Sequence, residues 1–267
     1  MKMLSLILIL SLFGSLKAFA IIGGTEVLPS EVLAKKVVMI LSKKSNEETY
    51  FICSGSLISR NVVLTAAHCF PSNNLTTQVL FGNDPIADLM QGQVRSIRAS
   101  KVIPHSNYND QNWSNDLALV QLIESAPADI EVTELSTAKS DQFTTAGFGR
   151  YTQETQDLDQ YRLRSLSVTK KNVMPQSMLW MFHYDGKILG ADAPFILADE
   201  FLDNQTVEAD SGGPLFEQQH GRLVQVGLNS FHIESKDISS KVVDSTEFYI
   251  KLSFHMKWLQ KTLQSLN

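Results

Sequence analysis

Short stretches rich in β-branched and aromatic residues recur along this chain between turn signals, and they limit its fold more than any other feature. Such residues favour strands, and short runs of them bounded by Gly, Pro, Asn, Asp or Ser are typical of all-β proteins. We therefore predict an all-β fold. The predicted strands are Val37–Leu41, Tyr50–Ile52, Val62–Thr65, Val79–Phe81, Leu117–Leu122, Leu223–Leu228 and Phe248–Leu252.

Helical periodicity is confined to the C-terminal end of the chain. The apolar residues there that share one helical face are Phe254, Trp258, Leu259, Leu263 and Leu266. Lys257 and Lys261 lie off that face, and Ser253 stands where an N-cap is expected. Because apolar residues three and four positions apart predict an amphipathic helix, we expect one here, with Ser253 as its N-cap.

The first twenty residues have the pattern of a cleavable signal peptide. Lys2 forms a short positive region, Leu4–Phe13 is apolar, and Ala18-Phe19-Ala20 places small residues at both recognition positions. The apolar run is shorter than the ~20 residues that a membrane span needs. We predict cleavage after Ala20 and export to an extracellular or periplasmic location, with no membrane contact afterwards.

The charge of the chain argues against a nucleic-acid partner. It carries 23 Lys and Arg against 28 Asp and Glu, a formal net charge of −5. Proteins that bind nucleic acid usually concentrate basic residues in a patch or stripe, and no basic run occurs here. We therefore predict that the chain does not bind nucleic acid.

A stretch with little periodicity lies near the middle of the mature chain. Residues 124–139 mix Pro, Ala, Ser, Thr and acidic residues, a composition typical of connections. We predict that this stretch joins two β units. One unit comprises residues 21–135, and the other comprises residues 136–267 with the terminal helix.

The chain contains two cysteines, Cys53 and Cys69, both in the exported part. An oxidising compartment allows them to pair, although two buried free thiols would also fit the sequence. A metal site is a poorer interpretation, because two sulfurs without a spaced pair of histidines do not complete a tetrahedron. We predict no metal site.

Three segments carry the residue types of nucleophilic catalysis. They are Leu64–Cys69 (LTAAHC), Asn115–Leu119 (NDLAL) and Ala209–Pro214 (ADSGGP). A serine hydroxyl is a weak nucleophile unless an imidazole takes its proton, and the imidazole needs a carboxylate to fix its tautomer. His68, Asp116 and Ser211 supply these three groups, in that order along the chain.

An alternative interpretation takes Ser211 as the nucleophile of an α/β-hydrolase. The glycine two residues after Ser211 fits the turn on which such a serine lies, and other acids and histidines follow it. That fold requires alternating strands and helices, whereas this chain predicts strands throughout and one terminal helix. The alternative also leaves the segment around His68 without a role.

The three segments resemble the trypsin/chymotrypsin family, and the resemblance extends from Ile21-Ile22-Gly23-Gly24 through Tyr249 and the final helix. It implies two antiparallel Greek-key β-barrels with the site between them. It also implies a secreted serine endopeptidase that acts on protein or peptide substrates without a cofactor. Ser211 would attack, His68 would move the proton, and Asp116 would orient His68.

The resemblance assigns roles to further residues around Ser211. The backbone amides of Ala209 and Ser211 would form the oxyanion hole, although the family usually has Gly where this chain has Ala209. The amine of Ile21, once released, would pair with Asp210. Cys53 and Cys69 would form a disulfide, since this is the one family cysteine pair that the chain retains.

The resemblance also locates the pocket that would receive the substrate side chain before the cleaved bond. Gln205 would form its floor, Glu247 its back, and Ser230, Phe231 and His232 its wall. Glu247 and Gln205 would make the pocket polar and able to accept Lys or Arg. Two alternatives remain open: a shifted loop that leaves Glu247 in solvent, or a pair between His232 and Glu247 that narrows the pocket.

A rival of another class is a pseudoprotease that keeps the fold and uses it as a binding module. The complete set of three catalytic residue types argues against this rival, whereas Ala209 and His232 argue weakly for it.

Overall fold

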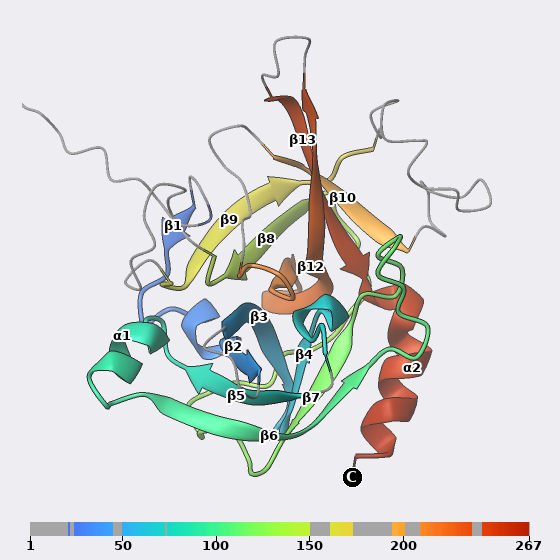
Figure 1. The fold of residues 1–267 in the computed structure, drawn as a ribbon. Helices are drawn as coiled ribbons and strands as arrows, with labels where there is room; N and C mark the ends of the chain where they lie inside the picture. The colour runs from blue at the N-terminus through green and yellow to red at the C-terminus, as the bar shows by residue number, and fades with distance from the viewer. Residues whose placement is uncertain are drawn as a thin grey trace, which may run out of the picture.

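The computed structural model of the chain contains two β structures and a C-terminal helix (Figure 1). It describes residues 21, 24–44, 50–72, 74–149, 161–172, 194–200, 209–236 and 242–266. The predicted signal peptide and Gln205 lie outside these residues. In the part of the chain that is described, no helix is long and apolar enough to cross a membrane.

Six antiparallel strands form a closed barrel in the first half of the chain. Their spatial order is β2-β3-β4-β7-β6-β5, and β2 pairs with both β3 and β5, which closes the ring. The strands are β2 (Val37–Lys44), β3 (Tyr50–Ser59), β4 (Val62–Thr65), β5 (Leu75–Phe81), β6 (Arg95–Pro104) and β7 (Ala118–Leu122). Their inward-facing aliphatic residues, among them Leu57, Leu64 and Leu119, are fully buried and form the barrel core.

The second β structure is a seven-stranded sheet in the order β1-β9-β8-β11-β12-β13-β10. Its strands are β1 (Thr25–Glu26), β8 (Gln142–Gly147), β9 (Arg164–Thr169), β10 (Phe195–Glu200), β11 (Pro214–Gln219), β12 (Arg222–Lys236) and β13 (Val242–Lys251). An isolated bridge joins Lys170, just after β9, to Ala198 of β10. The sheet therefore curls toward closure, although its strand ladder is not the continuous ring of the first barrel.

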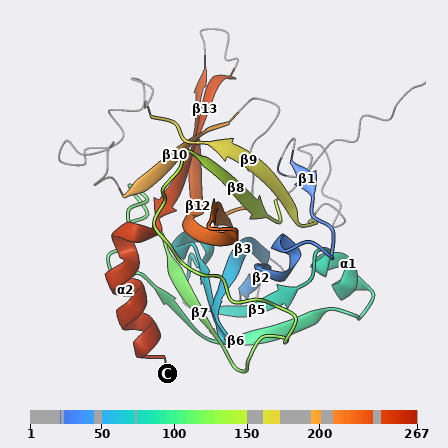
Figure 2. The same ribbon diagram turned by 180° about the vertical axis from the view of Figure 1, so that it is seen from behind.

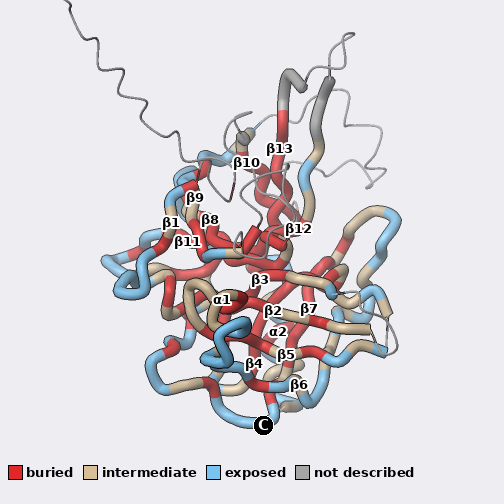
Figure 3. The backbone as a smooth tube through the Cα atoms, turned by 60° about the vertical axis from the view of Figure 1, so that its left-hand side comes forward, coloured by how far each residue is buried: buried red, intermediate tan, exposed pale blue. Residues whose placement is uncertain are grey.

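The structure confirms the predicted all-β class with a terminal helix. It also shows that the second sheet contains a strand from before the predicted boundary, because β1 pairs with β9. The division into residues 21–135 and 136–267 stays a prediction. Figure 3 shows that the strands of both structures are mostly buried, whereas the outer turns are exposed.

The C-terminal helix α2 (Leu252–Gln264) lies along the side of the barrel, as Figure 2 also shows from behind. Two details of its prediction were wrong. The helix follows β13 directly, so its N-cap is Lys251 and Ser253 lies inside the first turn. Phe254 is 55% exposed, because the face that packs inward carries Leu252, His255 and Leu259.

A second, short helix was not predicted. Helix α1 (Pro85–Met90) has six residues, too few for a periodic pattern, but its start carries clear signals. The side chain of Asp84 accepts a hydrogen bond from the N–H of Ala87, and Pro85 occupies the first turn, where its missing N–H is not needed.

Candidate active site

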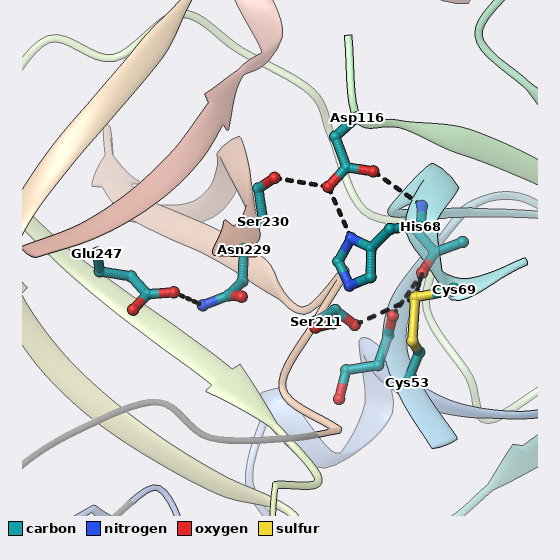
Figure 4. Close-up of polar contacts among 10 residues, drawn as sticks. Cys53, His68, Cys69, Asp116, Ser211, Asn229, Ser230 and Glu247 are labelled. Atoms are coloured by element: carbon teal, nitrogen blue, oxygen red, sulfur yellow. Dashed lines mark hydrogen bonds and ion pairs between the residues drawn. A yellow bond between two sulfur atoms is a disulfide. The ribbon is translucent and has the colours of Figure 1, made fainter. Parts of the chain in front are cut away.

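The structure brings together the three segments with catalytic residue types, at the junction of the two β structures (Figure 4). Thr65 at the end of β4 pairs with Ala118 at the start of β7. Because the two strands are in this register, His68 just after β4 and Asp116 just before β7 lie at the same edge of the barrel. Ser211 comes from the second sheet, in the turn before β11.

Asp116 is fully buried and holds His68 by two hydrogen bonds. Its Oδ2 lies 2.7 Å from Nδ1 of the imidazole, and its Oδ1 accepts a 2.9 Å bond from the His68 backbone N–H. A carboxylate only accepts hydrogen bonds, so the proton of a neutral His68 resides on Nδ1. The other ring nitrogen, Nε2, is then the basic one.

Figure 4 places the His68 ring between Asp116 and Ser211. The backbone around Ser211 is fixed from both β structures. The carbonyl of Ser211 accepts a 2.9 Å bond from the N–H of Ser54 in β3, and the N–H of Gly212 donates to the carbonyl of Asn229 in β12 at 2.8 Å. These bonds fix the backbone that carries Ser211 beside the imidazole of His68.

Gly212 is required at its position for two reasons. Its φ is +79°, a conformation that residues with a Cβ adopt at a cost. A Cβ would also collide with Oγ1 of Thr65 and with the carbonyl of Ser54. Any side chain here would therefore push the turn that carries Ser211 away from the barrel.

Ala209 has the backbone conformation that usually requires glycine. Its φ is +78°, and the residue is 6% exposed. Its carbonyl accepts a 2.8 Å hydrogen bond from the hydroxyl of Ser54. The Cβ of Ala209 therefore does not prevent the left-handed conformation, although it makes that conformation strained.

Ile21 and Asp210, the predicted activation pair, both lie in the interior. Ile21 is 0% exposed and Asp210 is 2% exposed. Oδ1 of Asp210 accepts a 2.7 Å bond from the N–H of Gly149, where a Cβ would overlap the carboxylate. The ion pair between the Ile21 amine and Asp210 stays a prediction.

Cys53 and Cys69 form the predicted disulfide. It ties β3 to the short 3₁₀-helix Ala67–Cys69, which carries His68. Each cysteine places a sulfur near the imidazole of His68, within 4.8 Å. Because the two sulfurs are bonded to each other, neither is available as a thiolate for a metal ion.

The predicted pocket residues have different environments. Ser230 is 2% exposed, and its hydroxyl donates a 2.5 Å bond to Oδ2 of Asp116. The side chain of Ser230 therefore points to Asp116, and the role of Ser230 in the pocket wall stays a prediction. The ring of Phe231 stacks on Phe248, with centroids 4.5 Å apart, and His232 is exposed.

Glu247 is 1% exposed, so the alternative that places it in solvent is wrong. Its Oε1 accepts a 2.5 Å hydrogen bond from the side chain of Asn229. In the register of β12 and β13, the residue opposite Glu247 is His232. A buried carboxylate on β13 therefore lies beside the part of β12 that follows Ser230.

Three further residues of the site were not predicted from the sequence. Trp113 packs its ring edge-on against His68 at 5.2 Å and lies 5.4 Å from the ring of Phe231. Ser54 and Asn229 both form hydrogen bonds with the backbone around Ser211. The side chain of Asn229 also binds the carboxylate of Glu247. No periodic pattern marks these residues; the one available signal was the closeness of Trp113 to Asp116 in the sequence.

Comparisons with known proteins agree with this geometry. The family model described as Trypsin matches residues 21–259. Granzyme B(G,H) of Mus musculus is 29% identical over 99% of this chain and 100% of its own length. Trypsin of Sus scrofa is 27% identical over 82% of this chain and 87% of its own length.

A solved structure entitled "Structure of GrC" has the same fold. It superposes with a TM-score of 0.67 at 23% identity and covers 91% of this chain and 99% of its own. The match of the family model to most of the chain, together with the buried Asp116–His68 pair beside Ser211, establishes that this chain belongs to the trypsin family of serine endopeptidases.

Proposed function

We propose that the chain cleaves peptide bonds through an acyl-enzyme on Ser211. The Oγ–H proton of Ser211 passes to Nε2 of His68 while Oγ bonds to the carbonyl carbon of the substrate. The tetrahedral intermediate then collapses, and the leaving amine takes the proton from His68. Water, deprotonated by the same nitrogen, releases the acyl group and restores Ser211.

The observation that carries this proposal is the buried position of Asp116. Its carboxylate accepts bonds from both the Nδ1 and the backbone N–H of His68, at 2.7 and 2.9 Å. These bonds hold the ring in one orientation and stabilise the imidazolium that forms during attack. A binding module has no need of a buried carboxylate directed at an imidazole that is 19% exposed.

The backbone amides of Ala209 and Ser211 form the oxyanion hole in this proposal. Charge that develops on the substrate oxygen is stabilised by donors that are already oriented before the reaction. The left-handed φ of Ala209 supports this role, because the chain maintains a strained conformation at the residue next to the nucleophile turn.

The substrate side chain before the cleaved bond is proposed to be Lys or Arg. Glu247 supports this preference, since a buried carboxylate gains from a cationic partner and Arg offers it two parallel hydrogen bonds. Members of the family act on proteins or peptides, so the substrate is a segment of a protein or peptide chain. We further propose export through a signal peptide that is cleaved after Ala20.

The experiment that tests this function is labelling with a fluorophosphonate probe, which reacts with an activated serine. The wild-type protein should react, and Ser211→Ala should lose both labelling and turnover, the latter by roughly 10⁶-fold. Ser140→Ala, which removes an exposed hydroxyl bonded to the carbonyl of Gln142, is the control and should behave like wild type. A wild-type protein that is folded but never labelled would support the pseudoprotease.

A further inference from the structure

The side chain of Ser54 bridges two backbone segments beside the active site. Its hydroxyl donates a 2.8 Å bond to the carbonyl of Ala209 and accepts a 2.9 Å bond from the N–H of Phe148, just after β8. Ser54 is 0% exposed, so water does not compete for either bond. One hydroxyl of the first barrel therefore binds two backbone groups of the second β structure.

The backbone of Ser54 makes contacts in the same region. Its N–H donates to the carbonyl of Ser211 at 2.9 Å, and its own carbonyl accepts a 2.8 Å bond from Oγ1 of Thr65. Ser54 thus holds the carbonyl of Ala209 and the carbonyl of Ser211 at once. The peptide planes 209–210 and 211–212, which contain these carbonyls, cannot rotate without breaking one of these bonds.

Ala209 is the strained residue in this turn. With φ at +78°, its Cβ is crowded, and a negative φ would relieve the crowding. A change of φ rotates the two peptide planes that meet at the Cα of Ala209 relative to each other. The plane on the C-terminal side contains the carbonyl that Ser54 holds, so relaxation that turns this plane breaks the bond.

We propose that Ser54 is a positioning residue that keeps Ala209 in its left-handed conformation and thereby directs the Ala209 N–H toward the substrate oxyanion. This inference rests on the proposed function, because the oxyanion hole is part of it. Ser54 touches no reacting atom. It acts through the backbone of Ala209 and compensates for the Cβ that this residue carries where glycine would be unstrained.

Ser54→Ala removes the hydroxyl and leaves the Ala209 carbonyl without its Ser54 bond. Ala209 then relaxes toward negative φ, and the transition state loses an oriented donor. We expect kcat to fall about 10- to 100-fold while KM changes by less than about twofold, because the lost donor acts on charge that develops only during reaction.

A double-mutant cycle with Ala209→Gly tests the coupling. Glycine adopts positive φ without steric strain, so it does not need the hydrogen bond from Ser54 to keep this conformation. In the Ala209→Gly background, Ser54→Ala should lower kcat by less than about threefold. The matched control is Ser56→Ala: Ser56 lies in the same strand and is 0% exposed, but its hydroxyl donates to Oε1 of Gln225 at 2.6 Å. Ser56→Ala should leave kcat within about twofold of wild type in both backgrounds.

Thermal unfolding measures the same coupling without any substrate. Ala209→Gly should raise Tm by roughly 2–4 °C when Ser54 is present, because the hydrogen bond from Ser54 keeps Ala209 in the strained conformation and glycine removes that strain. In the Ser54→Ala background the same change should raise Tm by less than half as much. Ser54→Gly, which leaves room for a water molecule between the two backbone groups, replaces Ser54→Ala if the latter does not fold.

The proposed role of Ser54 would be overturned if Ser54→Ala lowered kcat equally with Ala209 and with Gly at position 209. It would also be overturned if Ala209→Gly raised Tm equally with and without the Ser54 hydroxyl. A Ser54→Ala protein with wild-type kcat and a lower Tm would overturn it too, since it would show that the hydroxyl only stabilises the fold. Failure of the proposed function looks different: the wild-type protein would not react with the fluorophosphonate, while the Tm cycle would still decide whether Ser54 and Ala209 are coupled.

Discussion

The hydroxyl of Ser230 donates a 2.5 Å hydrogen bond to Oδ2 of Asp116, the same oxygen that lies 2.7 Å from Nδ1 of His68. Ser230 belongs to β12 of the second sheet, whereas Asp116 and His68 belong to the first barrel. The carboxylate that orients the imidazole is therefore held from both β structures. A shift of one structure against the other would disturb the imidazole as well as the position of Ser211.

The first prediction is that Ser230→Ala lowers kcat by roughly 10-fold with little change in KM. A hydrogen bond to a charged group contributes about 1.5–3 kcal/mol, and part of it is needed when His68 becomes charged in the transition state. Steady-state kinetics on a peptide substrate measures the effect. Ser42→Ala is the control, since it removes a buried hydroxyl that bonds Thr77 on the far strands of the barrel. A wild-type kcat in Ser230→Ala would contradict the prediction.

The second prediction concerns the mature N-terminus. We expect N-terminal sequencing of active protein to begin at Ile21, and Asp210→Asn to reduce kcat/KM by roughly 10²–10³-fold. The asparagine can still accept the bond from Gly149, but it cannot neutralise a buried amine, and an unpaired buried charge is costly. Asp141→Asn, which removes an exposed carboxylate paired with Lys170, should leave activity unchanged. Fully active protein with a terminus upstream of Ile21 would refute the pair.

The third prediction is that Glu247 gives the enzyme its preference for Lys or Arg before the cleaved bond. Glu247→Gln keeps the size of the side chain and an acceptor for Asn229, and it removes only the charge. Cleavage after Lys and Arg in a peptide library should then fall about 10- to 100-fold relative to neutral residues.

The control for this prediction is Glu217→Gln. Glu217 is also buried, at 3% exposure, but it binds the N–H of Lys139 and the side chain of Gln219, away from the catalytic residues. A basic preference that survives Glu247→Gln would assign the recognition to another acid. No basic preference in either protein would refute the specificity proposal.

The fold was predictable where burial is continuous along the chain. All four residues of Val62–Thr65 are buried, and the predicted bounds of β4 were correct. Among the strands that were not predicted, β6 and β11 were missed for opposite reasons. β6 exposes most of its residues, so no apolar stretch marks it as a strand. β11 carries the buried polar residues Glu217 and Gln219, and polar residues favour a loop prediction unless their hydrogen-bond partners are known.

The candidate site divides in the same way. Local sequence around His68, Asp116 and Ser211 predicts their roles, and the structure places Asp116 against His68 with the predicted disulfide beside them. Ser54 could not be identified, because its hydroxyl bonds residues 155 and 94 positions away in the sequence. Its role depends entirely on the way in which the two β structures pack.

His255 of α2 is a buried histidine whose protonation affects the stability of the fold. It is 3% exposed, and its ring lies 5.5 Å from the ring of His105 and 5.3 Å from that of Phe254. Burial, together with a smaller effect of the charge on His105, lowers the pKa of His255 from 6.5 to about 4. The helix therefore packs with a neutral imidazole.

The fourth prediction is that this histidine makes the protein less stable in mild acid. Between pH 6.5 and about 4 the unfolded chain binds a proton at His255 and the folded chain does not, so the free energy of unfolding decreases as the pH falls through this window. The total loss from this group is about 3 kcal/mol, and it levels off below the folded pKa. His255→Phe should flatten the profile of urea unfolding against pH across this range. His220→Asn removes an exposed imidazole at a left-handed position that asparagine tolerates, and it should keep the wild-type slope. If His255→Phe and wild type lose stability in parallel from pH 6.5 to 4, the dependence comes from other groups and His255 is not its source.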